Sequence, residues 1–347
     1  MALNTQPGWA RLFATVSGEH ERLPYAEIEG VLDAENIPRN ILECFTQVYR
    51  FTAPLEPVSK AFKRLALSHF LCEEIGVFKQ GASCNELIHP VLDLELKGSV
   101  AFRVRRIRAS ISPEEASALE AELNRKASNS FGLLVDLENP TSILEVVSSD
   151  GFLILGRRVC ASGRRSVLSR SGGRKPFFHP SSLKVELART MLNLARVRKG
   201  SVVVDPFSGT GTVLVEAHEL KAFPVGLDVD PVMVYSSLRN YRWFKTLSVC
   251  QVLGDARHTP FRRADAVVTD PPYGRRASTH GSESLRVYEA FVKDASRMLS
   301  DNGWMVFLAP SRLPVEGFLE SNGLRLMETY FIEVHMNLTR KLLVAKG

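Results

Sequence analysis

Residues 202–216, with the sequence VVVDPFSGTGTVLVE, decide the fold of this chain. The run of valines predicts a buried strand, and the apolar residues after Gly211 predict a helix. Gly209 and Gly211 allow the backbone between them to turn sharply and to approach a ligand closely. The turn contains neither GxGxxG nor GKS/T, which argues against a phosphate-binding loop. Asp205 at the strand end instead favours a cationic or amino-bearing ligand.

Two more acidic residues follow neighbouring strands in the same way. Asp228 ends the second strand of this region, where a carboxylate can accept hydrogen bonds from both hydroxyls of a ribose. Asp255 follows the third strand and is placed to reach the amino group of an adenine. Asp230 precedes Pro231 and is expected instead to cap the helix that begins there.

The fourth strand ends in the sequence DPPYG at residues 270–274. Two consecutive prolines hold the backbone in an extended turn and leave carbonyl groups free of ladder hydrogen bonds. The Asp270 carboxylate and the Pro271 carbonyl can both accept hydrogen bonds from an amino group. Tyr273 offers a flat face on which a base can stack. The motif therefore predicts a site that holds an amine on an aromatic base.

From residue 199 onward, strands and helices alternate strictly. We expect strands over 201–205, 225–228, 249–254, 266–269 and 304–309, and helices over 211–220, 231–244 and 285–299. The last two strands, 324–335 and 339–345, are close enough in the chain to pair with each other. The pattern predicts a parallel, doubly wound α/β sheet with a late antiparallel element.

The N-terminal half lacks this alternation. We expect a strand over 9–16 and helices over 24–35 and 61–75, followed by a small α+β unit. That unit is predicted to contain strands over 100–107, 133–137, 143–147 and 152–158. Its one helix, about 113–127, has Ser112 at the N-cap and Pro113 at the first helical position, which is good capping chemistry.

Composition excludes several classes of protein. The 347 residues are 45% hydrophobic and 24% charged, as in globular proteins, and their number suits two or three domains. No apolar run approaches the ~20 residues that a membrane helix needs, and no signal-peptide pattern is present. We therefore expect a cytoplasmic protein. The five cysteines form no CxxC pair, which argues against a metal or redox motif and leaves only a Cys72–Cys84 disulfide open.

Basic residues gather in two clusters, although the net charge is only +6. No Asp or Glu occurs between residues 151 and 185, and a second cluster lies within 103–108. One charge run alone is often solvated surface, but two in a mildly basic chain favour nucleic-acid binding. The candidate contacts are Arg103, Arg105, Arg157, Arg158, Arg164, Arg165, Arg174 and Lys175.

The motifs DPFSGTG, GLDVD, GDA and DPPYG, in this order, resemble those of class I S-adenosylmethionine-dependent methyltransferases that modify exocyclic amines. The chain more specifically resembles the archaeal-type tRNA guanosine-10 N2-methyltransferases. The resemblance covers essentially the whole chain and is strongest over 176–280. It implies a ferredoxin-like domain at 1–95, a THUMP RNA-binding domain at 96–160, a linker at 161–175 and a Rossmann-like methyltransferase domain at 176–347.

The same resemblance implies the site residues and the partners. Residues Asp270, Pro271, Pro272 and Tyr273 are expected to hold the guanine amine and its base in tRNA. The cofactor S-adenosyl-L-methionine is expected to contact His179, Pro180, Ser181, Asp205, Phe207, Gly209, Thr210, Gly211, Asp228, Asp255, Ala256 and Asp270. The tail VHMNLTR at 334–340 is similar to a VHxSLTR-like family ending, with Asn337 where Ser is expected. No metal is implied, and the number of methyl groups added stays open.

Other functions also stay open. A related amine methyltransferase could act on guanosine 6 of tRNA, on an rRNA guanine or on DNA adenine. Asp rather than Asn before Pro-Pro-Tyr favours the guanosine-10 group. A non-catalytic RNA-binding protein is the alternative from another class, and the retention of all four strand-end acids argues against it. We expect a monomer, although eukaryotic relatives work with a zinc-bearing partner.

Overall fold

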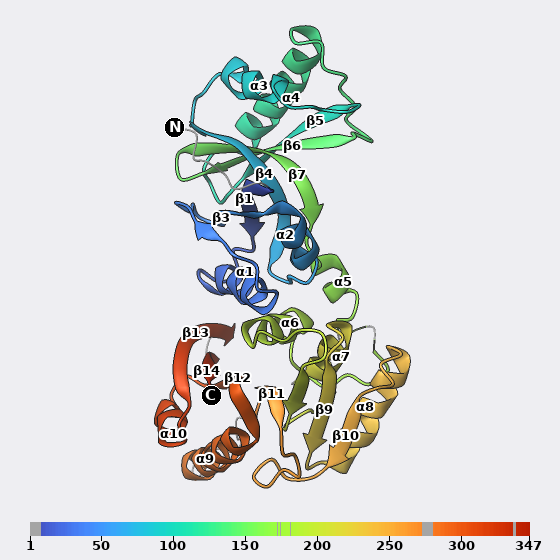
Figure 1. Ribbon diagram of the computed structural model, residues 1–347, viewed down its shortest axis with the longest axis vertical. Coiled ribbons are helices and arrows are strands. Elements are labelled where there is room, and N and C mark those ends of the chain that lie inside the picture. The colour runs from blue at the N-terminus through green and yellow to red at the C-terminus, as the bar shows by residue number, and fades with distance from the viewer. Residues whose placement is uncertain (1–7, 172, 174, 181, 273–279, 336–337) are drawn as a thin grey trace. The chain divides into compact units, whose positions relative to one another are not determined.

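The computed structural model describes residues 8–171, 173, 175–180, 182–272, 280–335 and 338–347. The chain divides into two compact units, and Figure 1 colours it from blue to red by residue number. The first unit comprises Met1–Tyr25, Ile37–Lys63 and Ser68–Ser162. The second comprises Ala26–Asn36, Arg64–Leu67 and Gly163–Gly347.

Seven strands of the described residues form one sheet in the first unit, in the order β2-β3-β1-β4-β7-β6-β5. Their bounds are β1 Trp9–Val16, β2 Asn40–Ile41, β3 Val48–Pro54, β4 Ser68–Lys79, β5 Val100–Arg106, β6 Ser142–Ser149 and β7 Phe152–Ala161. Neighbouring strands are antiparallel except for β5 and β6, which are parallel. The expected parts 1–95 and 96–160 thus share one sheet, and their separation into two domains stays a prediction.

The helices of this half are α1 Leu23–Ala34, α2 Leu55–Phe62, α3 Cys84–Leu92 and α4 Pro113–Asn129. The predicted start of α4 is confirmed, because Ser112 Oγ accepts a hydrogen bond from the Glu115 amide and the Glu115 carboxylate accepts one from the Ser112 amide. The predicted strand over 133–137 is wrong, since only an isolated bridge joins Val135 to Val100.

The predicted helix over 61–75 is also wrong. Helix α2 ends at Phe62, and the long strand β4 begins at Ser68 between β1 and β7. Leu71 and Cys72, on opposite faces of β4, are both fully buried. A strand covered on both faces has an unbroken apolar run, so its sequence lacks the alternation that separates a strand from a helix.

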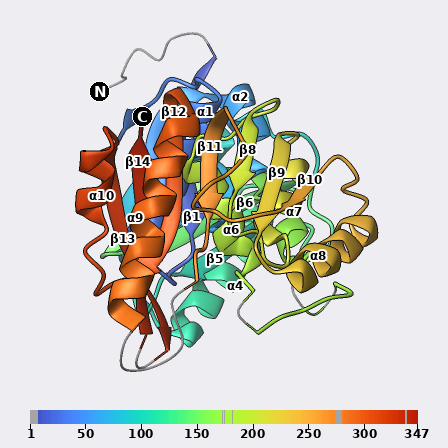
Figure 2. The ribbon, with the colours of Figure 1, turned by 90° about the horizontal axis from the view of Figure 1, so that it is seen from below.

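The sheet of the second unit confirms the predicted doubly wound architecture. Its order is β10-β9-β8-β11-β12-β14-β13, and Figure 2 shows β10, β9, β8 and β11 side by side. The bounds are β8 Val202–Asp205, β9 Phe223–Asp228, β10 Cys250–Leu253, β11 Ala264–Thr269, β12 Leu299–Pro310, β13 Arg325–His335 and β14 Leu338–Lys346. Strands β8 to β12 pair in parallel, whereas β14 pairs antiparallel with both β12 and β13.

The order in which the chain adds strands to this sheet reverses at β8. The chain runs outward from β8 through β9 to β10, and then returns to the other side of β8 as β11. In open α/β sheets, ligands bind outside the carboxyl ends of the strands at such a switch point. The helices of the unit are α5 Arg164–Leu168, α6 Val185–Leu194, α7 Thr212–Glu219, α8 Pro231–Trp243, α9 His280–Met298 and α10 Glu316–Ser321.

Helices α6 and α7 and the residues after α5 are joined by a buried ion-pair cluster. Glu216 of α7 is fully buried, and its carboxylate accepts hydrogen bonds from Arg189 of α6 and from Arg170, which follows α5. The expected linker over 161–175 therefore contains both a short helix and a buried ion pair.

Two features of the described residues bear on the class of protein to which the chain belongs. No helix among them has the length and apolar character of a membrane span. They also contain no group of three or more His, Cys, Asp or Glu side chains arranged to hold a metal ion. Cys72 and Cys84 are both buried free thiols, so the disulfide left open by the sequence is not formed.

Candidate active site

Strand-end carboxylates converge at the switch point of the second unit. Asp205 and Asp228 are the last residues of β8 and β9, and Asp270 directly follows β11. Asp205 is almost completely buried, and its Oδ1 accepts hydrogen bonds from Thr269 Oγ1 at 2.5 Å and from the Phe207 amide at 3.1 Å. The sheet thus brings together the acids that sequence reasoning selected.

The glycine turn after β8 faces open space on one side and packed residues on the other. Gly209 and Gly211 have φ angles of 49° and 81°, which disfavour other residues. A Cβ at Gly211 would lie 2.5 Å from the hydroxyl of Tyr241, whereas a Cβ at Gly209 would meet nothing closer than Phe207 O at 3.9 Å. The Gly209 amide donates to Asp228 Oδ2 at 2.8 Å. The turn can therefore approach a ligand closely at Gly209.

Burial makes this group of carboxylates reluctant to ionise. The pKa of Asp205 is raised to about 7, chiefly by burial and to a smaller extent by the nearby Asp228 and Asp270. Burial also raises the pKa of Asp228. Clustered carboxylates repel anions and favour a ligand that brings positive charge.

Asp270 has an ionic partner that sequence reasoning missed. Arg340 Nη1 lies 3.2 Å from Asp270 Oδ2, and both side chains are largely buried. Burial raises the pKa of Asp270 to about 7, despite the opposing effect of the Arg340 guanidinium. Arg340 is the last residue of the tail motif, and β14 brings it here through its pairing with Pro310 at the end of β12. Only that strand pairing, which the motif itself does not reveal, identifies the contact.

The rest of the DPPYG motif is described only in part. Pro271 is buried and Pro272 is exposed. Tyr273, expected to stack on a base, lies outside the described residues. The buried hydroxyl of Tyr288 in α9 donates to Leu308 O at 3.2 Å, and the charge of Asp270 contributes to its raised pKa. Asp270 thus lies near Tyr288 of α9 and Arg340 of β14.

A second segment, at 175–182, lies against the glycine turn. The Asn240 side chain bonds both the amide and the carbonyl of Phe177, at 3.0 and 3.1 Å, and also the Thr210 carbonyl. Thr210 Oγ1 donates to Ser182 Oγ at 3.1 Å, and the Ser182 amide donates to His179 O. The segment that contains the expected cofactor residues His179, Pro180 and Ser181 is therefore attached to the turn. Pro180 is exposed, and Ser181 lies outside the described residues.

Three further predicted cofactor residues have defined surroundings. The Asp255 carboxylate accepts hydrogen bonds from Arg257, whose Nη2 is 2.6 Å from Oδ2. Ala256 is buried. The ring of Phe207 packs edge-on against Phe291 of α9, so Phe207 supports the turn from within the core. The contact of Asp255 with adenine stays a prediction.

The predicted RNA-binding residues are mostly paired with acids. Arg103 pairs with Glu120, Arg157 with Glu73, and both Arg105 and Arg158 with the buried Glu145. These pairs include the half-exposed Arg105, which stays accessible to a phosphate group.

The basic residues at 164–175 divide differently. Arg164 donates to Ala66 O at 3.0 Å, and Arg165 is exposed. Arg174 lies outside the described residues. The amine of Lys175 is turned inward, and donates to Thr210 Oγ1 and Thr212 Oγ1 of the glycine turn.

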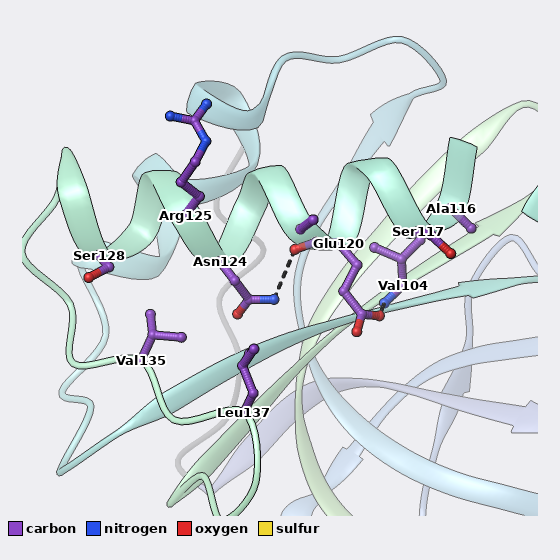
Figure 3. Close-up of a pocket in the computed structure, with 10 residues that line it drawn as sticks. Val104, Ala116, Ser117, Glu120, Asn124, Arg125, Ser128, Val135 and Leu137 are labelled. Carbon is purple, nitrogen blue, oxygen red and sulfur yellow. Dashed lines mark hydrogen bonds between the residues drawn. The ribbon is translucent and has the colours of Figure 1, made fainter. Parts of the chain in front are cut away.

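A separate groove of about 650 Å³ lies in the first unit, between α4, β5 and residues 135–137 (Figure 3). Its polar side chains already hold the backbone of β5. Glu120 Oε2 accepts from the Val104 amide, and Asn124 Oδ1 accepts from the Phe102 amide. The groove therefore contains no cluster of groups free to act on a substrate, and we place the chemistry in the second unit.

The sheet order of the second unit and its strand-end acids define a Rossmann-like methyltransferase domain. Residues 172–341 match the family described as "RMKL-like, methyltransferase domain" (UPF0020). The crystal structure of TrmN from Thermus thermophilus has the same fold, with a TM-score of 0.57 and 20% identity over 97% of this chain and 99% of that one.

Relatives with known names define the family more closely. The chain is 31% identical to the tRNA (guanine(10)-N2)-dimethyltransferase of Methanothermobacter thermautotrophicus over 334 residues, which cover 95% of this chain and 97% of that protein. It is 26% identical to the enzyme of the same name from Methanocaldococcus jannaschii, over 95% and 98% of the two chains. The chain belongs to the family of tRNA (guanine(10)-N2)-dimethyltransferases.

The cofactor of this enzyme is S-adenosyl-L-methionine, and the residues present fit it. The cofactor carries a sulfonium and an ammonium group, which the buried acids favour. The open side of Gly209 admits a ligand against the backbone, and the contact of Asp228 with the ribose stays a prediction. When bound, S-adenosylmethionine supplies an activated methyl group.

Proposed function

We propose that this enzyme methylates the exocyclic N2 amine of guanosine 10 in tRNA and forms N2-methyl- and N2,N2-dimethylguanosine. The names of the relatives support the target. The observation that carries the chemistry is the buried Asp270 carboxylate at the end of β11, beside the acids of the cofactor site. We propose a monomer that acts in the cytoplasm.

Asp270 and the Pro271 carbonyl act by orienting the amine. The N2 lone pair of guanine is delocalised into the ring and is a poor nucleophile. Hydrogen bonds from the N2 hydrogens to these two acceptors would hold the lone pair toward the methyl group and favour its localisation on nitrogen. Arg340 Nη1 donates to Asp270 Oδ2 and would hold the carboxylate in place as the amine binds.

The proton balance also involves Asp270. A bond forms between N2 and the methyl carbon as the sulfur–carbon bond breaks, and the alkylated amine becomes strongly acidic. One N2 proton then passes to the Asp270 carboxylate or to water. A pKa near 7 suits a group that accepts a proton and releases it again at neutral pH.

The target base must leave its stacked position to reach this site, because guanosine 10 is paired in folded tRNA. We propose that Tyr273 stacks on the extruded base. The N-terminal regions 1–95 and 96–160, as ferredoxin-like and THUMP domains, would hold the tRNA through phosphate contacts. The linker 161–175 would add the exposed Arg165 to them, and 176–347 would be the catalytic domain.

Methyl transfer to an unmodified tRNA transcript, followed by nucleoside analysis, tests this function. We expect N2-methylguanosine followed by N2,N2-dimethylguanosine with the wild-type transcript, and neither with a transcript carrying adenosine at position 10. N2-methylguanosine in both transcripts would move the target to another guanosine. Incorporation of label without any methylated guanosine would overturn the assignment.

A further inference from the structure

Lys175 is a cation turned into the wall of the cofactor site. Its Nζ donates hydrogen bonds to Thr210 Oγ1 at 2.9 Å and to Thr212 Oγ1 at 3.2 Å. These threonines flank Gly211, which is the N-cap of α7 and provides no side chain to cap the first turn. The anchored Phe177 backbone keeps the chain close to the turn just after Lys175.

No carboxylate of the described residues forms an ion pair with this amine. Within the described part of the chain, no carboxylate offsets the effect of burial, which lowers the pKa of Lys175 to about 8. Threonine hydroxyls accept its hydrogen bonds but bring no negative charge. A partly buried cation of this kind is stabilised by an anionic ligand.

The anionic group of the ligand is not expected beside Asp205 and Asp228, because these carboxylates favour positive charge. Asp205 and Asp228 lie on the strand-end side of the glycine turn, and Lys175 lies against its two threonines. S-adenosylmethionine has a single anionic group, the carboxylate of its methionine part. The free amides in the first turn of α7 add to the preference for an anion beside Lys175.

We propose that Lys175 binds the carboxylate of S-adenosylmethionine, together with Thr210 and Thr212 at the start of α7. Lys175 is thus a cofactor-binding residue, although its position in a basic cluster predicts an RNA contact. The proposal rests on the methyltransferase function but is independent of which base is methylated.

A binding cycle without tRNA isolates this contact. Calorimetry would compare S-adenosylhomocysteine with its decarboxylated analogue, on the wild type and on Lys175→Met. Removal of the ligand carboxylate should weaken binding to the wild type by about 10- to 100-fold, as expected for a charge-assisted hydrogen bond. It should weaken binding to Lys175→Met by less than about threefold, because the partner is already absent.

Two further variants complete the test. Lys175→Arg keeps the charge and should keep most of the preference for the carboxylate. Lys184→Met removes an exposed lysine from the N-cap of α6 and should leave the wild-type preference unchanged. The comparison of the two ligands on the wild type needs no variant, so a loss below about threefold there contradicts the proposal even if Lys175→Met does not fold.

Different results would overturn the proposal. An equal preference for the carboxylate in the wild type and in Lys175→Met would show that Lys175 does not contact it. Normal cofactor binding combined with a loss of tRNA affinity would make Lys175 an RNA contact. Neither result would affect the guanosine-10 assignment, which the nucleoside analysis tests separately.

Discussion

Two opposing effects set the charge of Asp270. Burial favours the neutral carboxylic acid, and the guanidinium of Arg340 favours the carboxylate. Among the described residues, Asp205 of β8 and Tyr288 of α9 also interact electrostatically with it. The carboxylate is the better acceptor for an amine hydrogen, so the residue that keeps Asp270 ionised controls the fraction of enzyme that can react.

Arg340→Met should therefore shift the pH dependence of methyl transfer. Loss of the guanidinium raises the pKa of Asp270, so the acidic limb of the kcat/KM profile should move to higher pH by about one pH unit or more. Arg340→Lys should move it less, since the positive charge is retained. Profiles measured between pH 6 and 9 check this, with S-adenosylhomocysteine affinity as the control for folding. Unchanged profiles in both variants would remove Arg340 from the account.

The contacts of a single residue could be predicted from the sequence when its partner lies close to it in the chain. The capping pair Ser112 and Glu115 and the cap Asp230 were predicted, because such contacts span two or three residues. Arg340 was missed because strand pairing alone brings it to Asp270, 70 residues away. Lys175 was assigned to RNA because a run of charge does not reveal which side chains point inward.

Among the elements, helices α6 and α7 are held by one buried carboxylate. Glu216 is fully buried and accepts hydrogen bonds from Arg170 at 2.6 and 2.9 Å and from Arg189 at 2.6 and 2.9 Å. Helix α7 carries the glycine turn at its start, so this contact also supports the cofactor site.

Glu216→Gln should destabilise the second unit by about 3–5 kcal/mol, because it leaves the buried Arg189 without its counter-charge and Arg170 with the more distant Glu219. Glu219→Gln is the matched control. Glu219 lies 3.5 Å from Arg170 but is 38% exposed, so its loss should change stability by less than about 1 kcal/mol. Urea unfolding followed by circular dichroism measures both. Similar midpoints for the two variants would show that the buried charge is not needed.

The parallel elements were predictable, and β4 was not. From β8 onward, strands alternate with helices, which is the pattern of a doubly wound α/β sheet. The acids in this region mark the ends of the strands. Strand β4 has apolar residues on both faces, so its pattern matched a helix until its neighbours β1 and β7 were known.

Over the whole molecule, charge is divided between inside and outside. The chain has a net charge of +6, yet the cofactor site is lined by buried acids. A basic exterior attracts tRNA, and an acidic interior favours a cationic cofactor. Most of the predicted RNA contacts are already paired with acids, whereas Arg165 is exposed.

Arg165→Ala should therefore reduce the salt dependence of tRNA binding. Loss of one phosphate contact lowers the slope of log Kd against log salt by about 0.7–0.9. Lys60→Ala removes an exposed charge outside both basic clusters, where Lys60 pairs with Glu56, and should leave the slope unchanged. Filter binding over a range of salt concentrations compares the two. Equal slopes for Arg165→Ala and Lys60→Ala would indicate that residues 161–175 connect the flanking regions without binding tRNA.

The most direct test of the account is single-turnover methyl transfer by Asp270→Asn, with enzyme and cofactor in excess over tRNA. The substitution keeps the size of the side chain and removes its charge and its proton-accepting oxygen. We expect the formation of N2-methylguanosine at position 10 to slow by about 100-fold or more, with S-adenosylhomocysteine and tRNA affinities within about threefold of wild type. Asp301→Asn, an exposed control, should react at the wild-type rate. A near-normal rate for Asp270→Asn would contradict the proposed chemistry.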